Sequence, residues 1–461
     1  MPKPPVHIVI LAAGKGSRMR SKLPKVLHKI ADKSLLEHVL DASLGVEPDK
    51  IHIVVGHGKE QVMEALESHP QAKLFNWVTQ AEQLGTGHAV MQALPDIDKK
   101  ANVLVLTADV PLLQSTTLAN LASKMQDAPL AILTAVVQQP FGLGRIVRNK
   151  NDKVIGIVEE KDATQKQRAI QEINSGIMAA QGEYLSDWLN DISNDNAQQE
   201  YYLTDIADMA HKAGKTIATL TIDTVDEVSG INDRVQLAQA ERVYQRVQAE
   251  NLMAQGVTII DPARVDIRGD VSIGADTVID INTLLIGPMS IGSNVYIAPN
   301  CVISASSIAD DVTVHPNTVI ENSELASGVN VGPFARLRPG TKLSANVKIG
   351  NFVETKNAQL AADAKVSHLS YVGDATVGTN TNIGAGVITC NYDGAYKHQT
   401  TIGNDVFVGS DSQLVAPVDI ADGATIGAGS TITNNVERNQ LAISRTKQKQ
   451  IDGWQRPAKK K

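Results

Sequence analysis

Residues 265–303 read VDIRGDVSIGADTVIDINTLLIGPMSIGSNVYIAPNCVI, and an aliphatic side chain recurs there at every sixth position. The series comprises Ile267, Ile273, Ile279, Leu285, Ile291, Ile297 and Ile303. After a slip of one residue it continues at Ile308, Val314 and Ile320, and after a second slip at Leu325, Val331, Leu337, Leu343 and Ile349. A last tract carries Ile402, Val408, Leu414, Ile420, Ile426 and Ile432. No helix has a period of six, so the series predicts a parallel β-helix built from hexapeptides.

The spacing also explains the composition. Each short strand would point one aliphatic side chain inward and bury it against the coils above and below. Glycine, asparagine and aspartate beside the inward positions, as in residues 272–276 and 401–405, suit corners that need tight turns and sometimes positive φ. One aliphatic residue per repeat accounts for an aromatic content of only 3%. The period alone leaves the handedness, and another kind of solenoid, open.

The first half of the chain has a different pattern. From Val6 to about Gly230, short β-rich runs such as residues 7–11, 50–56 and 102–109 alternate with longer amphipathic segments. This alternation is typical of βαβ units around a mainly parallel sheet, which binds ligands beyond the carboxyl ends of its strands. Residues 233–255 contain no proline and predict one connecting helix with Leu237, Ala240, Tyr244 and Val247 on one face. We therefore expect a domain at 1–232, a linker helix at 233–255 and a solenoid domain at 256–461.

Charge and cysteine content narrow the class of protein. A net charge of −7 argues against general nucleic-acid binding, and we interpret Lys459, Lys460 and Lys461 as a solvated basic tip. The two cysteines argue against a disulfide framework and favour a reducing compartment. The apolar run at 6–14 is too short to span a bilayer and lacks the features of a signal peptide. We expect a cytoplasmic protein without a membrane or nucleic-acid partner.

A glycine loop, LAAGKGSRM at residues 11–19, directly follows the first predicted strand. Such a loop offers backbone N–H groups to phosphate oxygens, and Lys15, Arg18 and Lys25 can neutralise charge during phosphoryl transfer. Met19 replaces the third glycine of the dinucleotide fingerprint, and no GK[ST] completes a P-loop. Taken alone, the loop could also be an ordinary glycine turn.

Two further loops, residues 80–89 and 106–113, follow later predicted strands. Asp109 is well placed to hold Mg²⁺ on nucleotide phosphates, although an aspartate before VPLL could also cap a helix. Glu159, Asn174 and Asn232, taken alone, equally suit a surface carboxylate and turn caps.

The solenoid pattern is interrupted twice, at residues 351–371 and 384–401, and we expect loops there. The second stretch concentrates Asn391, Tyr392 and Asp393, which suit polar recognition. His368 lies in the first stretch, and imidazole can take the proton that an amine loses when it attacks a thioester. A lone histidine is, however, more often structural.

Together these segments resemble one known family over essentially the whole chain. The resemblance to the bifunctional N-acetylglucosamine-1-phosphate uridyltransferase / glucosamine-1-phosphate acetyltransferase family is carried by LAAGKGSRM, PKVL, QAEQLGTGHA, DVPL, GRI, GIVEEKDA, EINSG, FARLRPG, NFVETK, SHLSYVGD, NIGAGVITCNYDG and VFVGSD. It implies an α/β protein with a Rossmann-like nucleotidyltransferase domain and a left-handed parallel β-helix. It further implies that acetyl-CoA acetylates glucosamine 1-phosphate, and that UTP then converts N-acetylglucosamine 1-phosphate into UDP-N-acetylglucosamine and pyrophosphate. The product would feed envelope polysaccharides.

For the uridyltransferase site, the resemblance implies Mg²⁺ ligands at Asp109 and Asn232 and charge stabilisation by Arg18 and Lys25, without a covalent intermediate. It implies sugar contacts from Gly144, Glu159 and Asn174. It implies UTP or UDP contacts from Leu11, Ala12, Gly14, Lys25, Gln80, Gly85 and Thr86. The chain departs from many relatives at Thr107 and Ala108, so a sugar or nucleotide contact there is not carried over.

For the acetyltransferase site, the resemblance implies that His368 is the general base and that a homotrimer shares the site between subunits. Arg338, Lys356, Tyr371 and Asn382 would bind the sugar phosphate. The residues implied to line the acetyl-CoA site are Ala385, Asn391, Tyr392, Ser410, Ala428 and Arg445. Ser367 replaces a frequent glycine before the histidine.

Two other functions remain to be weighed. A single-activity sugar-1-phosphate nucleotidyltransferase could use the β-helix for regulation or assembly, but the set His368, Asn391, Tyr392, Ser410 and Arg445 argues against it. A noncatalytic assembly or binding protein could retain both folds, but the intact glycine loop, Lys25 and Asp109 argue against that.

Overall fold

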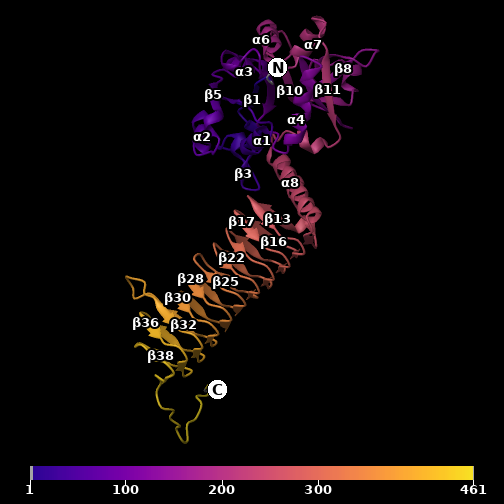
Figure 1. Ribbon diagram of the computed structural model, residues 1–461. Coiled ribbons are helices and arrows are strands. Elements are labelled where there is room, and N and C mark those ends of the chain that lie inside the picture. The colour runs from indigo at the N-terminus through magenta and orange to yellow at the C-terminus, as the bar shows by residue number, and fades with distance from the viewer. Residues whose placement is uncertain (1–3, 460–461) are drawn as a thin grey trace. The chain divides into compact units, whose positions relative to one another are not determined.

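The computed structural model describes residues 4–459, which fold into two compact units that meet between Tyr244 and Gln245. This boundary lies within α8 (Arg234–Ala254), a helix that covers nearly the whole range 233–255 (Figure 1). Lys460 and Lys461 of the predicted basic tip lie outside the described residues. Within those residues, no helix combines the length and the apolar character that a membrane span requires.

The first unit is built on a mixed sheet with the order β11-β7-β10-β6-β1-β4-β5. Within this sheet, β1 (Val6–Ala12) runs parallel to its neighbours β6 (Asn102–Thr107) and β4 (Lys50–Val55). The other strands are β5 (Phe75–Thr79), β7 (Leu130–Val136), β8 (Arg145–Arg148), β9 (Val154–Val158), β10 (Glu172–Gln181) and β11 (Ile217–Ile222). Along this path only β10, among the described strands, runs opposite to its neighbours, which confirms the mainly parallel sheet. A hairpin of β2 (Lys29–Ile30) and β3 (Lys33–Ser34) lies apart from the sheet.

Helices cover both faces of this sheet. Ile8 and Ile10 of β1 join one buried cluster, whereas Val9 joins another on the opposite face. Both faces of the strand are therefore buried, which explains its continuous apolar run. Helices α1 and α4 contribute to the first cluster and α3, α6 and α7 to the second. The helix bounds are α1 (Leu35–Leu44), α2 (Lys59–Ala65), α3 (Thr86–Ala93), α4 (Ser115–Ser123), α5 (Gln165–Arg168), α6 (Gly182–Asp191) and α7 (Asp205–Lys212).

The second unit is a parallel β-helix whose coils stack from β13 to β38 (Figure 1). One face consists of β12 (Thr258–Ile259), β15 (Val278–Ile279), β18 (Tyr296–Ile297), β21 (Thr313–Val314), β24 (Asn330–Val331), β27 (Lys348–Asn351), β29 (Lys365–His368), β31 (Asn382–Ile383), β34 (Phe407–Val408), β37 (Thr425–Ile426) and β39 (Leu441–Ala442). We call it the first face. The predicted left-handed sense stays a prediction.

The remaining strands form two further ladders joined into one sheet. They are β13 (Val265–Arg268), β14 (Val271–Ile273), β16 (Thr283–Ile286), β17 (Met289–Ile291), β19 (Val302–Ser304), β20 (Ser307–Ile308), β22 (Val319–Glu321), β23 (Glu324–Leu325), β25 (Arg336–Leu337), β26 (Lys342–Leu343), β28 (Glu354–Leu360), β30 (Tyr371–Val377), β32 (Ile388–Cys390), β33 (Thr400–Ile402), β35 (Gln413–Val415), β36 (Val418–Ile420) and β38 (Thr431–Ile432). Each coil thus has three faces, and the strands of successive coils pair in parallel.

The predicted inward positions are confirmed. Every aliphatic residue of the six-residue series is buried in one continuous core, because each side chain packs against its counterparts on neighbouring coils. At one corner, Asp276, Asn294 and Asp311 on three successive coils, and Asn346 two coils further along, have φ between 56° and 61°; Gly328 occupies the corner between Asp311 and Asn346 with φ of 72°. Asparagine and aspartate tolerate this left-handed conformation better than most residues, as expected for the corners.

The predicted loop at residues 351–371 is wrong, because the coil continues through β28 and β29. Thr355 takes the inward position and pairs in register with Leu337 and Val372. Its fully buried hydroxyl lies 2.9 Å from the hydroxyl of Thr341. A polar inward residue therefore interrupts the aliphatic series without interrupting the coil.

The second predicted loop, at residues 384–401, is confirmed only for residues 391–399, because β32 and β33 keep the ends of this range in the coil. Thr389 again takes an inward position and accepts a hydrogen bond of 2.8 Å from the backbone of Gly373. Residues 391–399 then leave the solenoid in a turn closed by an antiparallel bridge between Tyr392 and Lys397, and β33 resumes the coil at Thr400.

A buried histidine pair crosses the first sheet between β1 and β4. Asn76 donates a hydrogen bond of 3.0 Å to Nδ1 of His52, so Nε2 of His52 can donate to Nδ1 of His7 at 3.1 Å. This arrangement requires neutral rings. Burial, and then the neighbouring His7, lower the pKa of His52 from 6.5 to about 4. Burial also lowers the pKa of His7.

We predict that this pair makes the first unit sensitive to acid. The unfolded chain binds the His52 proton near pH 6.5 and the folded chain only near pH 4, so stability falls as the pH falls through this window. His52 alone should cost about 2 kcal/mol between pH 7.5 and pH 5. Urea unfolding of a Trp454→Phe background, followed by the fluorescence of Trp77 and Trp188, measures this cost. Adding His52→Gln should flatten the pH dependence, whereas His57→Gln, at an exposed position, should not; equal slopes in both variants would contradict the assignment.

Candidate active sites

The first candidate site lies where β1, β5 and β6 end. A cavity of 270 Å³ opens there between the glycine loop, the segment after β5 and the end of β6. It is lined by eight of the residues predicted for nucleotide and metal, namely Leu11, Ala12, Gly14, Lys25, Gln80, Gly85, Thr86 and Asp109. Gln83, Thr107 and Glu200 line it as well, and of these only Thr107 had been considered from the sequence. The carboxyl ends of parallel strands therefore converge here as predicted.

Lys25, Asp109 and Asn232 form one cluster beside this cavity. The ammonium group of Lys25 makes a short ion pair with Oδ2 of Asp109 and also donates to Oδ1 of Asn232 at 3.3 Å. Arg18 donates to the same Asn232 oxygen at 2.9 Å. The side chains of Lys25 and Asp109 are only 14% and 21% exposed, so water screens their attraction incompletely.

This cluster fits a divalent cation. A carboxylate oxygen and an amide oxygen converge on a single positively charged point, and Mg²⁺ prefers hard oxygen ligands of this kind. Within residues 4–459 no three histidine, cysteine, aspartate or glutamate side chains form a metal cluster. A metal held here would therefore need other oxygens, and Mg²⁺ usually takes these from water and substrate phosphates.

Within the glycine loop, Gly16 packs closely against the side chain of Lys25. Gly16 has φ of +57°, and a Cβ at this position would lie 2.6 Å from Cβ of Lys25. Gly14, by contrast, has free space where its Cβ would be. Gly16 is therefore required by the packing of the lysine stem.

Three residues predicted to contact the sugar form a second group in the same unit. Asn174 donates its backbone N–H to the carbonyl of Gly144 at 2.9 Å, and the carboxylate of Glu159 lies 3.3 Å from the position of a Cβ on Gly144. Burial raises the pKa of Glu159, whereas a hydrogen bond of 3.0 Å from the Thr204 hydroxyl opposes this shift. Thr204 was missed because its sequence position before α7 suggests a helix cap, yet its side chain makes no capping bond.

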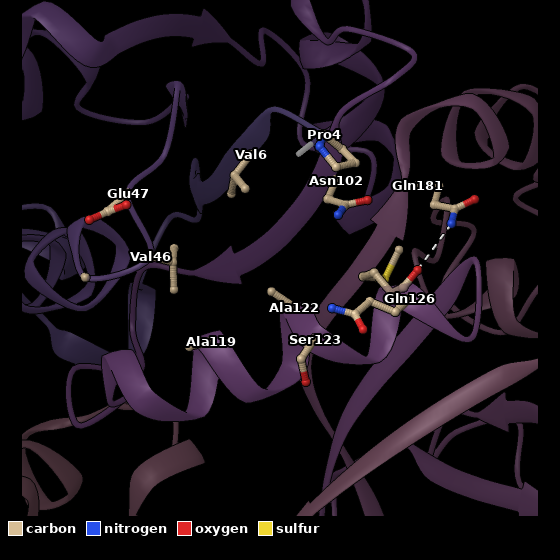
Figure 2. A pocket seen from close by; sticks show the side chains of 12 residues that line it. Pro4, Val6, Val46, Glu47, Asn102, Ala119, Ala122, Ser123, Gln126 and Gln181 are labelled. Atoms are coloured by element: carbon tan, nitrogen blue, oxygen red, sulfur yellow. Dashed lines mark hydrogen bonds between the residues drawn. The ribbon is translucent and has the colours of Figure 1, made fainter. Parts of the chain in front are cut away.

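A larger cavity, of 430 Å³, lies at the opposite edge of the sheet (Figure 2). It is formed around the first residues of β1 and β6, with Val6, Asn102 and Gln181 among its lining residues. Glu47 supplies a carboxylate, and no described lining residue carries a positive charge. This cavity does not suit a phosphate group.

The acetyltransferase residues fall into two groups on the solenoid. Arg338, Lys356 and Tyr371 follow the ladder of β25, β28 and β30, where Arg338 donates to Glu354 at 2.9 Å. Lys397, on the projecting loop, lies so close to Lys356 that it lowers the pKa of that amine. Cations gathered in this way suit a phosphate. Lys397 was missed because no repeat pattern indicates where a loop residue will lie.

His368 belongs to the first face, at the end of β29. Its exposed ring donates from Nδ1 to Oδ1 of Asn351 at 2.6 Å, and the two residues pair in register on adjacent coils. Because Nδ1 carries the proton, Nε2 keeps a free lone pair that can accept one. Asn351 was not identified from the sequence, although it lies one coil before His368.

The residues implied for acetyl-CoA mostly lie at one corner on successive coils. The backbone of Gly386 bonds the carbonyl of His368, Ala385 accepts from Asp411, and Ser410 accepts from Gly429. Arg445 donates to the carbonyl of Ala428 at 2.5 Å. These contacts begin at the coil that carries His368 and continue on the coils that follow it.

Asn391, Tyr392 and Asn382 lie apart from this column. Asn391 is buried and donates to Oδ2 of Asp374 at 2.5 Å, and the exposed Tyr392 donates to the carbonyl of Gly394 at 2.6 Å. Asn382 pairs with Lys365 on the first face. The short corner at Leu369 and Ser370 connects His368 to the face that carries Tyr371, so the residues surround one edge of the solenoid rather than a closed pocket.

Comparison with known proteins gives matches for both units. Residues 8–174 match the model of the MobA-like NTP transferase domain. Residues 399–434 match the model of the bacterial transferase hexapeptide (six repeats).

Three curated relatives cover nearly the whole chain, and each carries the name bifunctional protein GlmU. The relative from Marinobacter nauticus is 53% identical over 455 residues, which is 99% of this chain and 99% of the relative. The relative from Stutzerimonas stutzeri is 52% identical over 99% of this chain and 100% of its own length. The relative from Idiomarina loihiensis is 52% identical over 99% of both chains.

We predict that Gly16→Ala disables the first site. The added methyl group would displace Lys25 and would strain a backbone with positive φ, so UTP affinity, measured by isothermal titration calorimetry, should fall at least tenfold (roughly 1.4 kcal/mol). Gly14→Ala serves as the stability control because its methyl group meets no atom, so its melting temperature should match that of the wild type. Unchanged UTP binding in Gly16→Ala would refute this account of the loop.

Proposed function

Because this chain belongs to the family of bifunctional GlmU proteins, we propose that it makes UDP-N-acetylglucosamine in two steps at two separate sites. It is a multifunctional transferase with a uridyltransferase and an acetyltransferase activity. We assign the uridyltransferase to residues 1–232, the linker to 233–255 and the acetyltransferase to 256–461. We place it in the cytoplasm, where its product would enter the synthesis of envelope polysaccharides.

In the first step, the amine of glucosamine 1-phosphate attacks the thioester carbonyl of acetyl-CoA. Nε2 of His368 accepts the proton that the amine loses, and CoA leaves as the new amide forms. The proposal is supported by the exposed ring and by the bond from Nδ1 to Asn351, which leaves Nε2 free.

Binding in this step is assigned to the two groups on the solenoid. The sugar phosphate is bound by Tyr371 and Asn382 and by the cations Arg338, Lys356 and Lys397, in line with the mutual approach of the two lysines. Acetyl-CoA is bound by Ala385, Asn391, Tyr392, Ser410, Ala428 and Arg445.

In the second step, a phosphate oxygen of N-acetylglucosamine 1-phosphate attacks the α-phosphorus of UTP, and pyrophosphate leaves. The bond to the attacking oxygen forms as the bond to pyrophosphate breaks, so no covalent enzyme intermediate is needed. The glycine loop orients the phosphates, and Arg18 and Lys25 stabilise the charge that develops. Gly144, Glu159 and Asn174 hold the sugar, while Leu11, Ala12, Gly14, Gln80, Gly85 and Thr86 hold the nucleotide.

Asp109 and Asn232 are assigned to Mg²⁺. When bound, the ion would neutralise negative charge on the phosphates of UTP. The convergence of both side-chain oxygens on one ammonium group supports this assignment.

We assign the oligomer as a homotrimer formed through the β-helix. Phe334 and Phe352 stack on adjacent coils, with ring centroids 5.4 Å apart, and are 50% and 55% exposed. Leu369 continues this apolar edge on the next coil and is 62% exposed. Exposed apolar side chains in a row favour a subunit interface, and this edge adjoins His368.

The observation that carries the proposal is that two chemically different clusters, one around Asp109 and one around His368, lie in separate compact units. The purified protein, given glucosamine 1-phosphate, acetyl-CoA, UTP and Mg²⁺, should release both CoA and pyrophosphate. His368→Ala should abolish CoA release but spare pyrophosphate release from N-acetylglucosamine 1-phosphate and UTP, and Asp109→Ala should do the reverse. A single-activity nucleotidyltransferase would release no CoA, and loss of both activities in either folded variant would contradict two independent sites.

We also predict that Asn351 positions His368 for acetyl transfer. Asn351→Ala removes the acceptor for Nδ1–H, so the ring can adopt the tautomer in which Nε2 is protonated and cannot accept a proton. The rate of acetyl transfer should fall roughly tenfold, corresponding to a barrier increase of about 1.4 kcal/mol, and ¹⁵N chemical shifts of the imidazole should report the changed tautomer. Asn330→Ala is the matched control because it removes a similar bond, of 3.0 Å, to His315 on other coils; an unchanged His368 spectrum in Asn351→Ala would rule the role out.

A further inference from the structure

The ammonium group of Lys25 occupies the point on which the two proposed metal ligands converge. We propose that Lys25 is a resident cation of this site, and that Mg²⁺ binds there only weakly until the triphosphate of the nucleotide has drawn the lysine away. This inference rests on the proposed function, because it takes Asp109 and Asn232 as the metal ligands. It adds an order of binding and a second role for Lys25 in the same reaction.

Lys25 and a metal ion compete for the same two oxygen atoms. Lys25 bonds the carboxylate of Asp109 and the amide oxygen of Asn232 together, so a metal that takes both oxygens must replace it. An ammonium group and a divalent ion at the same point repel each other strongly, because both side chains of the ion pair are mostly shielded from solvent. Arg18 adds a second positive charge on the Asn232 oxygen. The nucleotide-free site therefore discriminates against a metal ion.

The backbones of both ligand residues are anchored close to the site, whereas the charged group of Lys25 lies at the end of a long side chain. Gln236 accepts a hydrogen bond of 2.7 Å from the backbone of Asn232, which anchors that residue at the start of α8. Ile231 donates to the backbone carbonyl of Asp109 at 2.9 Å, and this bond anchors the carboxylate residue. Lys25 instead reaches the site through a flexible four-carbon side chain. It can change partners without any change in the backbone.

The neighbouring cavity supplies the alternative partner. Lys25 and Asp109 both line it, together with the glycine loop. A triphosphate bound along that loop presents several negatively charged oxygens to Lys25. These oxygens attract the ammonium group more strongly than the single carboxylate of Asp109 does. Asp109 is then released at the moment when phosphate oxygens become available as further metal ligands. Nucleotide and metal should therefore strengthen each other's binding, and by the same factor in each direction.

The test measures Mn²⁺ binding to the full-length protein without nucleotide, by electron paramagnetic resonance of the free ion. Lys25→Met keeps the length of the side chain and removes its charge, so it should bind Mn²⁺ at least tenfold more tightly than the wild type. Lys25→Arg keeps the charge and should bind Mn²⁺ as weakly as the wild type. Lys22→Met removes a charge from an exposed position three residues away and should have little effect.

Asp109→Asn separates this inference from the proposed function. If Asp109→Asn abolishes Mn²⁺ binding while Lys25→Met binds no more tightly than the wild type, the metal site stands and the resident cation is refuted. If adding Asp109→Asn to Lys25→Met leaves its tightened Mn²⁺ binding unchanged, the proposed metal site is itself wrong and the inference fails with it.

A second measurement needs no variant. Acylation of lysine amines, read by mass spectrometry of the wild-type protein, should show that Lys25 becomes more reactive as Mn²⁺ is added without nucleotide, because the metal displaces it from Asp109. Lys22 provides the internal reference in the same peptide region. Reactivity of Lys25 that is independent of saturating Mn²⁺ would overturn the proposal.

Discussion

Each coil of the solenoid has a few aliphatic side chains to bury, and only another coil can cover them. This constraint governs the second unit. Because the inward positions are filled by a repeating set of small aliphatic residues, the outward positions and the corners are free to carry polar and charged groups. His368, Arg338 and Lys356 all use this freedom. The chemistry of the unit lies on its edges, while its core remains nearly uniform.

The first unit meets the same need in a different way. Its strands are covered on both faces, so only side chains at the strand ends, such as Leu11 and Thr107, reach the cavity. Access begins where the strands end, and there the glycine loop, Gln80 and Asp109 come together from strands that are separate in the sequence. The sheet therefore brings the charged residues together without any of them belonging to its core. The close packing of Gly16 against the side chain of Lys25 also fixes the position of the glycine loop relative to this lysine.

Much of this arrangement could be predicted from the sequence because it depends on periodicity and on strand ends. The inward aliphatic residues are confirmed, one helix spans residues 234–254, and Gly14, Gln80 and Asp109 line the same cavity. The coil through Thr355 was missed because a search for aliphatic residues does not register a threonine at an inward position. Thr204, Asn351 and Lys397 were missed because each is linked to its partner only by the fold. The assignment of individual residues to substrates came from family resemblance, since neither spacing nor charge distinguishes a sugar ligand from a surface side chain.

Three buried threonines of the solenoid also affect how its coils align. Aliphatic side chains attract without direction, so a stack of nearly identical coils could shift by one repeat and still bury its apolar surface. The hydroxyl groups of Thr341 and Thr355 are both fully buried and satisfy each other, and Thr389 is held by the backbone of Gly373 in the same region. In a shifted stack these hydroxyl groups would be buried in an apolar interior without hydrogen-bond partners, at a cost of about 1–3 kcal/mol for each. The hydroxyl groups therefore favour one register of the coils over all shifted ones. They do so in the part of the solenoid where a shift of one repeat would separate His368 from Asn351.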